Sequence, residues 1–192
     1  MAQSPTPTSR TFGRVHVELV QGDIVRQPDV DAVVNAANAQ LRIGGGVAGA
    51  IHRAAGSGLE AEAVPLGPIR PGQAVVTGGH GLANRYVIHV LGPVYGLDTP
   101  SDELLAEGYR NALRLAEKKE MSSLAFPAIS TGAFGYPVED AAHVALGTIA
   151  DVALNLQHVR LVRFVLFTAR DLAVHQDALA QVTGGDPGEA AP

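Results

Sequence analysis

A run of three glycines, Gly44, Gly45 and Gly46, lies where the chain is expected to enter a helix. Without side chains, backbone N–H groups can converge on an anion, and the positive end of the helix dipole adds to the attraction. The run also spells GxGxxG as far as Gly49. That dinucleotide-binding fingerprint must follow its strand at once, and here about eight residues intervene after Asn35. A Rossmann site is therefore disfavoured, while a plain flexible loop stays open as the alternative.

A second glycine-bearing loop follows a later strand-like segment. The hydroxyls of Ser130 and Thr131, with the N–H groups around Gly132, offer a second anion-binding wall. Phe134 lies among small residues on this loop, which suits a platform for a sugar or base better than a core position. Two such walls facing one cleft fit a diphosphate better than a single phosphate.

An acidic residue, Asp23, directly follows Gly22 after the first strongly apolar segment. Its carboxylate can accept hydrogen bonds from an exocyclic amine such as that of adenine. Aspartate in a turn also bonds its own backbone frequently. On the sequence alone, both interpretations of Asp23 stay open.

Several other chemistries are excluded or disfavoured. The chain has no cysteine, which excludes thiolate catalysis, disulfides and Cys-ligated metals. It has no P-loop motif, and Ser130 lies outside any GxSxG elbow. The seven histidines show no HExxH or similar ligand spacing. His89, in the middle of an apolar run, is predicted to be a structural histidine. No metal and no cofactor are expected.

The elements that must position these loops alternate between strand-like and helix-like segments. Short apolar runs predict strands at residues 15–20, 32–35, 73–77, 86–91, 124–127 and 163–167. Helices are predicted at residues 46–55, 102–118, 137–154 and 171–181. This alternation predicts an α/β fold, a three-layer α/β/α sandwich around a central mixed, mainly parallel sheet. Ligands of such sheets bind at the carboxyl ends of the strands.

Composition agrees with one globular domain. Of the 192 residues, 46% are hydrophobic and 17% charged. Residues 13–182 are predicted to form the domain, between disordered tails at 1–12 and 183–192. The net charge of −5 argues against a protein that binds nucleic acid through its overall charge, and no sequence-specific nucleic-acid partner is expected. No signal peptide or apolar span is evident, so a cytoplasmic, monomeric protein without membrane partners is expected.

Five segments, in this order, resemble the macrodomain family. They are residues 22–24 (GDI), 34–38 (VNAAN), 44–47 with 50–56, 87–89 with 92–93, and 126–132 with 134–137, and the similarity extends over residues 15–179. One such segment alone would mean little, but five in register are a specific signal. The resemblance implies a cleft for ADP-ribose or an ADP-ribosylated substrate.

The resemblance also implies roles for individual residues. Asp23 would hold the adenine amine, the Ile24 amide would meet the ring nitrogens, and Phe167 would pack against adenine. Asn35 and Asn38 would face the distal ribose. The ligand-binding residues implied are Asp23, Ile24, Ala36, Asn38, Gly44, Gly45, Gly46, Val47, Ser130, Thr131, Gly132, Ala133, Phe134 and Phe167. Catalysis would depend on Asn35, Asn38 and Gly45.

One position departs from the hydrolytic branch of that family. The MacroD-type hydrolases carry an aspartate after the GGGV run, where this chain has Ala48. Asparagine does not titrate and cannot replace a general base, so the substrate's own phosphate would have to activate water. Two functions stay open: slow hydrolysis of ADP-ribosyl esters, such as mono-ADP-ribosylated protein or O-acetyl-ADP-ribose, and a non-catalytic ADP-ribose reader.

Overall fold

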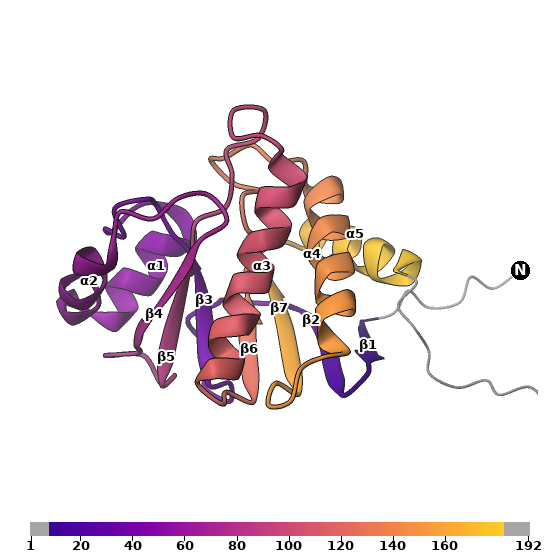
Figure 1. Ribbon diagram of the computed structural model, residues 1–192, viewed down its shortest axis with the longest axis horizontal. Coiled ribbons are helices and arrows are strands. Elements are labelled where there is room, and N and C mark those ends of the chain that lie inside the picture. Colours follow the sequence, from indigo (N-terminus) through magenta and orange to yellow (C-terminus); the bar gives the residue numbers. More distant parts are fainter. Residues whose placement is uncertain (1–7, 183–192) are drawn as a thin grey trace, which may run out of the picture.

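The structure, a computed structural model, describes residues 8–182. In this range seven strands alternate with five α-helices and one 3₁₀ helix (Figure 1). The strands are β1 (Ser9–Phe12), β2 (Val15–Gln21), β3 (Ala32–Ala36), β4 (Ala74–Gly78), β5 (Tyr86–Val90), β6 (Ser123–Phe126) and β7 (Leu161–Leu166). The helices are α1 (Gly46–Ala55), α2 (Ser57–Ala63), η1 (Val64–Leu66), α3 (Ser101–Lys118), α4 (Val138–Ala153) and α5 (Ala169–Gln181).

All seven strands form one mixed sheet in the order β1-β2-β7-β6-β3-β5-β4. The pairs from β2 through β7, β6 and β3 to β5 are parallel, while β1 and β4 pair antiparallel at the two edges. The carboxyl ends of β2, β7, β6, β3 and β5 therefore meet at one edge of the sheet. This edge is where the predicted binding loops begin.

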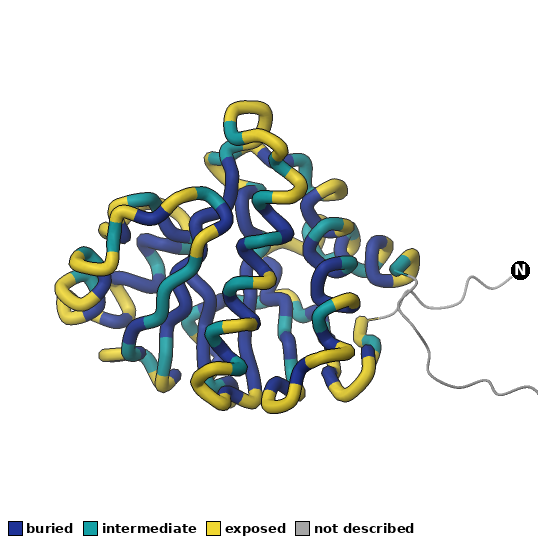
Figure 2. Tube along the Cα trace, in the orientation of Figure 1, coloured by how far each residue is buried: buried dark blue, intermediate teal, exposed yellow. Residues whose placement is uncertain are grey.

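Alternating side chains of the central strands build a core on each face of the sheet. Val34 of β3 packs into the cluster formed with α3, α4 and α5, whereas its neighbour Val33 packs into the cluster formed with α1 and α2. Figure 1 shows α3 and α4 crossing one face, and Figure 2 shows that the strands behind them are mostly buried. The predicted three-layer α/β/α sandwich with a mainly parallel sheet is confirmed.

The N-terminal boundary of the domain was predicted too late in the chain. Residues 9–12, assigned to a disordered tail, form β1, which pairs with β2 from Ser9↔Glu18 to Phe12↔Val15. Phe12 is buried in the main core. Four residues with a single apolar side chain carry too weak a pattern to be recognised before β2 is in place to pair with them. The other parts of the predicted tails, 1–7 and 183–192, lie outside the described residues.

Candidate functional site

A cavity of about 340 Å³ opens at the carboxyl ends of β3 and β6. Its walls are short loops and the first turn of α1, and almost all of its side chains are small. The lining residues are Ala36, Ala37, Asn38, Gly44, Gly45, Gly46, Val47, Ala48, Gly92, Ala128, Ile129, Ser130, Gly132, Ala133 and Phe134. Ten of these were predicted as ligand-binding residues from the sequence. The two glycine loops, about 85 residues apart in the chain, thus face each other across one cleft.

The first wall is the glycine run that begins α1. Gly45 is the N-cap of this helix and makes no side-chain capping bond. The N–H groups of the first turn have no carbonyl partner four residues earlier within the helix, so they are available to an anion. Gly46 has a φ of +53°, a conformation that favours glycine, and a Cβ at Gly45 or Gly46 would meet no atom within 4 Å. The space above these residues is open for a ligand.

The second wall is the loop that follows β6. Ser130 has a φ of +67°, and its carbonyl accepts a hydrogen bond from the Tyr136 N–H at 3.0 Å, which closes the loop. The Ser130 Oγ is buried and has no hydrogen-bond partner among the described residues. It lies so close to Gly92 that any Cβ at that position would collide with it. The loop therefore holds a hydroxyl with unused hydrogen-bonding capacity at the wall of the cleft.

Two other residues of this loop differ in their roles. Thr131, predicted to bind ligand, does not line the cavity, because its Oγ1 donates to the Ala128 carbonyl at 2.8 Å within the loop. Phe134 does line the cavity, and it also packs against a small buried cluster that contains Leu41 and Leu91. The ring is thus held in place from behind and presents its other side to the cleft.

The two predicted asparagines are also placed differently. Asn38 lines the cavity, and its side chain closes the turn that follows it by donating to the Arg42 carbonyl at 2.8 Å and accepting from the Arg42 N–H at 3.0 Å. Asn35 does not line the cavity and is only 1% exposed. Strand alternation directs it toward the face that carries Val33 and α1. The prediction that Asn35 faces the ligand directly was therefore wrong in its geometry.

Asn35 belongs to a buried polar chain beneath the cleft. Its Nδ2 lies 3.1 Å from Nδ1 of His89 on β5, and His89 Nε2 lies 2.9 Å from Thr77 Oγ1. The Thr77 hydroxyl donates to the Gly78 carbonyl, so this geometry suits a neutral imidazole that accepts at Nδ1 and donates at Nε2. Burial, with the nearby His52 as a smaller cause, lowers the pKa of His89 to about 4. His89 is thus a bonded structural histidine, as predicted.

The predicted adenine end lies at the carboxyl ends of β2 and β7. The Gly22 N–H donates to the Leu166 carbonyl at 3.0 Å, which joins the loop after β2 to the end of β7. Asp23 Oδ1 accepts from the Val25 N–H at 3.1 Å, so the alternative interpretation as a turn residue also holds. The Asp23 carbonyl accepts from Gln27, which Arg163 holds in turn at 2.9 Å. This loop is thus braced against the sheet.

Ile24 and Phe167, the other two residues predicted to contact adenine, differ in solvent exposure. Ile24 is buried, so only its backbone can meet a ligand. Phe167 is 82% exposed directly after β7, which leaves its ring free to stack. Asp23, Ile24 and Phe167 do not line the 340 Å³ cavity but lie along the same edge of the sheet.

Sequence reasoning named no ligand-binding role for five lining residues, which are Ala37, Ala48, Gly92, Ala128 and Ile129, although it singled out Ala48 as the position of an aspartate in the hydrolytic branch. They are small or apolar and carry no chemical signal of their own. Gly92, directly before Pro93 and after a predicted strand, was the one position where a turn residue at a strand end could have suggested the site.

The cleft offers backbone N–H groups to an anion, and its lining carries no side chain that titrates near neutral pH. No Asp, Glu, His, Lys or Arg lines it. Ala48 occupies the first turn of α1 at its wall. The described residues contain no cluster of three or more His, Cys, Asp or Glu that could hold a metal ion. They also contain no helix long and apolar enough to cross a membrane.

Comparison with known proteins agrees with this geometry. The family model for the Macro domain matches residues 34–145. The O-acetyl-ADP-ribose deacetylase of Salmonella typhimurium is 45% identical over 177 residues, which cover 89% of this chain and 97% of that protein. The Oceanobacillus iheyensis macrodomain with ADP has a TM-score of 0.84 at 40% identity, covering 90% of this chain and 94% of that one. The Trypanosoma brucei macrodomain in complex with ADP-ribose has a TM-score of 0.79 at 34% identity, covering 85% of this chain and 68% of that one. This chain belongs to the macrodomain family.

Proposed function

We propose that this chain binds ADP-ribose, with the diphosphate between the two glycine loops. The observation that carries the proposal is the pair of open backbone walls around Gly45 and Gly132, where a Cβ would meet no atom within 4 Å. The first turn of α1 supplies free N–H groups and the positive end of a helix dipole. Because no cation lines the cleft, these backbone groups would hold the charge of the diphosphate.

The two ends of the ligand would lie along the edge of the sheet. Asn38 and Phe134, which line the cavity, would meet the distal ribose. Asp23 and Phe167 would take adenine beyond the ends of β2 and β7. From β2 to β3 the sheet order crosses three strand spacings, or about 14 Å. A diphosphate with a nucleoside at one end and a ribose at the other can bridge such a span. The Trypanosoma brucei relative in complex with ADP-ribose supports this choice of ligand.

Calorimetry with free ADP-ribose tests this proposal. A dissociation constant in the micromolar range or tighter, about −8 kcal/mol or stronger, is expected. NAD should bind much more weakly, since its nicotinamide would crowd the end of the cleft at Phe134. Binding of NAD as tight as that of ADP-ribose would contradict the proposal and favour a dinucleotide-binding site instead.

The activity proposed for this site is slow hydrolysis of ADP-ribosyl esters. Water would add to the ester and release ADP-ribose and the free acid, acetate or a protein carboxylate. With no titratable side chain at the wall, the proton of the water would pass to a phosphate oxygen of the substrate. Asn38 and the glycine loops would act by positioning, and the usual 10²–10⁴-fold (roughly) from a protein general base would be missing. The name of the Salmonella relative, a deacetylase of O-acetyl-ADP-ribose, supports this reaction class.

The same absence of titratable lining residues also favours the second candidate, a non-catalytic reader of ADP-ribose. Incubation with a protein ADP-ribosylated on aspartate or glutamate separates the two, with an enzyme-free control. Release of ADP-ribose above the control supports the hydrolase. Tight binding of ADP-ribose with release no faster than in buffer leaves the reader.

A further inference from the structure

The loop between β2 and β3, residues 22–31, carries the aspartate proposed to bind adenine and contains no helix or strand. Ile24 and Val30 of this loop pack with Val165 of β7 in the apolar cluster that the sheet forms with α1 and α2. These contacts hold the loop against the sheet. Apolar burial is non-directional, however, so it does not fix the direction in which the Asp23 carboxylate points.

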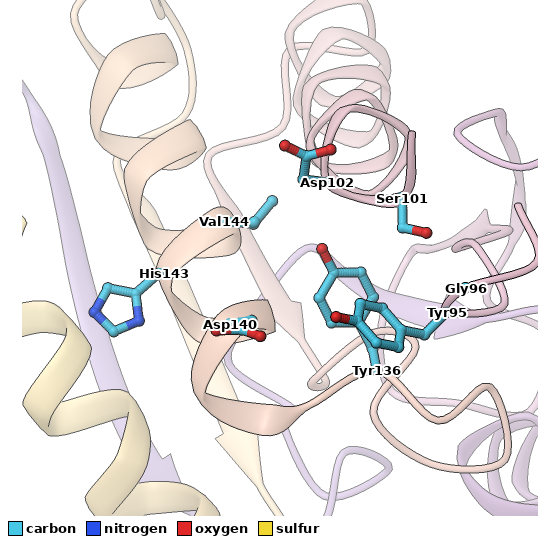
Figure 3. A pocket seen from close by; sticks show the side chains of 8 residues that line it. All are labelled: Tyr95, Gly96, Ser101, Asp102, Tyr136, Asp140, His143 and Val144. Atoms are coloured by element: carbon cyan, nitrogen blue, oxygen red, sulfur yellow. The ribbon is translucent and has the colours of Figure 1, made fainter. Parts of the chain in front are cut away.

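The cavity of about 610 Å³ between the first turns of α3 and α4 does not lie near this loop (Figure 3). Tyr95 and Tyr136 are among its lining residues, and the Tyr95 N–H donates to the Phe134 carbonyl at 2.9 Å. Phe134 lines the end of the cleft proposed for the distal ribose. This larger cavity therefore adjoins the distal end of the ligand, and selection of the base depends on the surroundings of Asp23.

A chain of hydrogen bonds connects Asp23 with the sheet. Gln27 Nε2 donates to the Asp23 carbonyl at 2.9 Å, and Gln27 Oε1 accepts from Arg163 Nη1, also at 2.9 Å. Asn84 Nδ2 donates to the backbone carbonyls of Gln27 and Val30 at 2.7 and 2.8 Å. Gln27 is only 9% exposed. It cannot move without breaking hydrogen bonds of both its side chain and its backbone.

Arg163, at the other end of this chain, is fixed by two carboxylates. Its Nε donates at 2.6 Å to Glu18, its register partner on β2, and its two Nη atoms donate to Asp29 at 2.8 Å each. The bond to Arg163 lowers the pKa of Asp29, so this pair stays charged at neutral pH. The bidentate contact leaves the planar guanidinium, 14% exposed, one orientation. The sheet thus holds Gln27 through a rigid side chain.

The Asp23 carboxylate keeps one oxygen for a ligand. Its Oδ1 accepts from the Val25 N–H at 3.1 Å, whereas Oδ2 lies 3.9 Å from Nε of the exposed Arg26, a surface ion pair of little strength. The Val25 bond and the bond from Gln27 to the Asp23 carbonyl together set the direction of Oδ2. A hydrogen bond weakens steeply as its angle departs from linear, so this direction determines how well Asp23 can accept from an amine.

We propose that Gln27, held by Arg163, is a positioning residue that makes the site select adenine over bases with a carbonyl in place of the exocyclic amine. The inference rests on the proposed binding of ADP-ribose with adenine at Asp23. A fixed carboxylate accepts from the amine of adenine and repels the carbonyl oxygen of hypoxanthine at the same place. Without the bond from Gln27 the carboxylate can turn away from that oxygen, and the preference for adenine falls.

Calorimetry with ADP-ribose and with its hypoxanthine analogue, inosine diphosphate ribose, measures this preference. Wild type should bind ADP-ribose about 10- to 100-fold more tightly, the effect of a charge-assisted hydrogen bond that only adenine can make. Gln27→Met, of similar length but without an amide, should lower this ratio by about 3-fold or more. An unfolded fraction of the protein raises both apparent dissociation constants equally. A merely structural role of Gln27 would therefore leave the ratio unchanged.

Two further variants test whether Gln27 acts through Asp23. Gln27→Glu keeps an acceptor for Arg163 but cannot donate to the Asp23 carbonyl, so it should lower the ratio as well, also where Gln27→Met destabilises the fold. Its added charge would weaken both anionic ligands alike. In the Asp23→Ala background, Gln27→Met should not change the ratio further, because both substitutions affect one carboxylate.

Asn111 on α3 provides the matched control. Its amide also accepts from an arginine, Arg114, and donates to a backbone carbonyl, that of Gly72 at 2.8 Å. Asn111→Leu should keep the wild-type ratio. An unchanged ratio in Gln27→Met, an equal fall in Asn111→Leu, or additive effects of Gln27→Met and Asp23→Ala would overturn the inference.

The same measurements separate this inference from the proposed function. Equal and tight binding of both nucleotides to wild type would overturn the inference together with the placement of adenine at Asp23, but it would leave the diphosphate site. Failure of ADP-ribose to bind wild type would refute the proposed function itself.

Discussion

Replacing His89 by glutamine should weaken the dependence of folding stability on pH. His89 is fully buried between Asn35 and Thr77, and in the folded state its pKa is lowered to about 4, chiefly by burial. In the unfolded chain the imidazole recovers its ordinary value of about 6.5. As pH falls below that value the unfolded chain takes up a proton and the folded one does not. The stability contributed by neutral His89 is therefore present above about pH 6.5 and lost as pH falls toward 4.

The two pKa values set the size of the effect. A difference of about 2.5 units corresponds to about 3 kcal/mol when the loss is complete. Between pH 7 and pH 5 this histidine alone should lower the free energy of unfolding by about 2 kcal/mol. Glutamine can accept from Asn35 and donate to Thr77 through its amide, but it does not titrate. The His89→Gln variant should therefore lack this part of the fall in the free energy of unfolding.

Urea unfolding at pH 7, 6 and 5 measures the difference, with m values compared to check that the transition is unchanged. Other groups also lower the free energy of unfolding at low pH, since burial lowers the pKa of His52 and His175. These contributions are present in both proteins and cancel in the comparison. The exposed His158→Gln is the matched control and should follow wild type. If the free energy of unfolding depends on pH equally in wild type and His89→Gln, the reasoning about the buried imidazole is refuted.

Three further predictions concern the cleft. Asp23→Ala should weaken ADP-ribose binding by about 1.5–3 kcal/mol, the usual value of a charge-assisted hydrogen bond, and an unchanged calorimetric Kd would make Asp23 a turn residue only. Gly45→Glu and Gly132→Glu should each abolish ADP-ribose binding in protein shown by circular dichroism to be folded, because a carboxylate would enter the open space of the diphosphate. Gly147→Glu, on α4, is their control, and retained binding in either cleft variant would remove that loop from the site. Ala48→Asp, which places a carboxylate at the wall of the cleft, should raise the release of ADP-ribose from a modified acceptor or leave it unchanged, and a fall in turnover at equal affinity would contradict the positioning argument.

Local sequence patterns were sufficient for much of the fold and for the main binding loops. Apolar runs and helix-terminal signals predicted six of the strands and four of the helices, because burial on two faces and the helix dipole leave local marks. The helix of residues 46–55 has the predicted bounds. The glycine runs at 44–46 and around 132 were recognised because backbone access to an anion requires positions without side chains. Short polar elements such as β1 carried too little local signal.

Tertiary structure decided which of the candidate residues meet. The sheet order places β6 beside β3, and this brings together Ser130 and Gly45, which nothing local in the sequence connects. Successive side chains of β3 point to opposite faces of the sheet. Ala36 therefore lines the cleft, whereas the side chain of Asn35 lies on the face covered by α1 and contacts His89. The Thr131 hydroxyl donates to the Ala128 carbonyl of its own loop and not to the cleft, and this hydrogen bond exists only once the loop has folded. Residue types determined what chemistry was available, whereas strand order and side-chain direction, which depend on the packing of the whole sheet, determined where it could act.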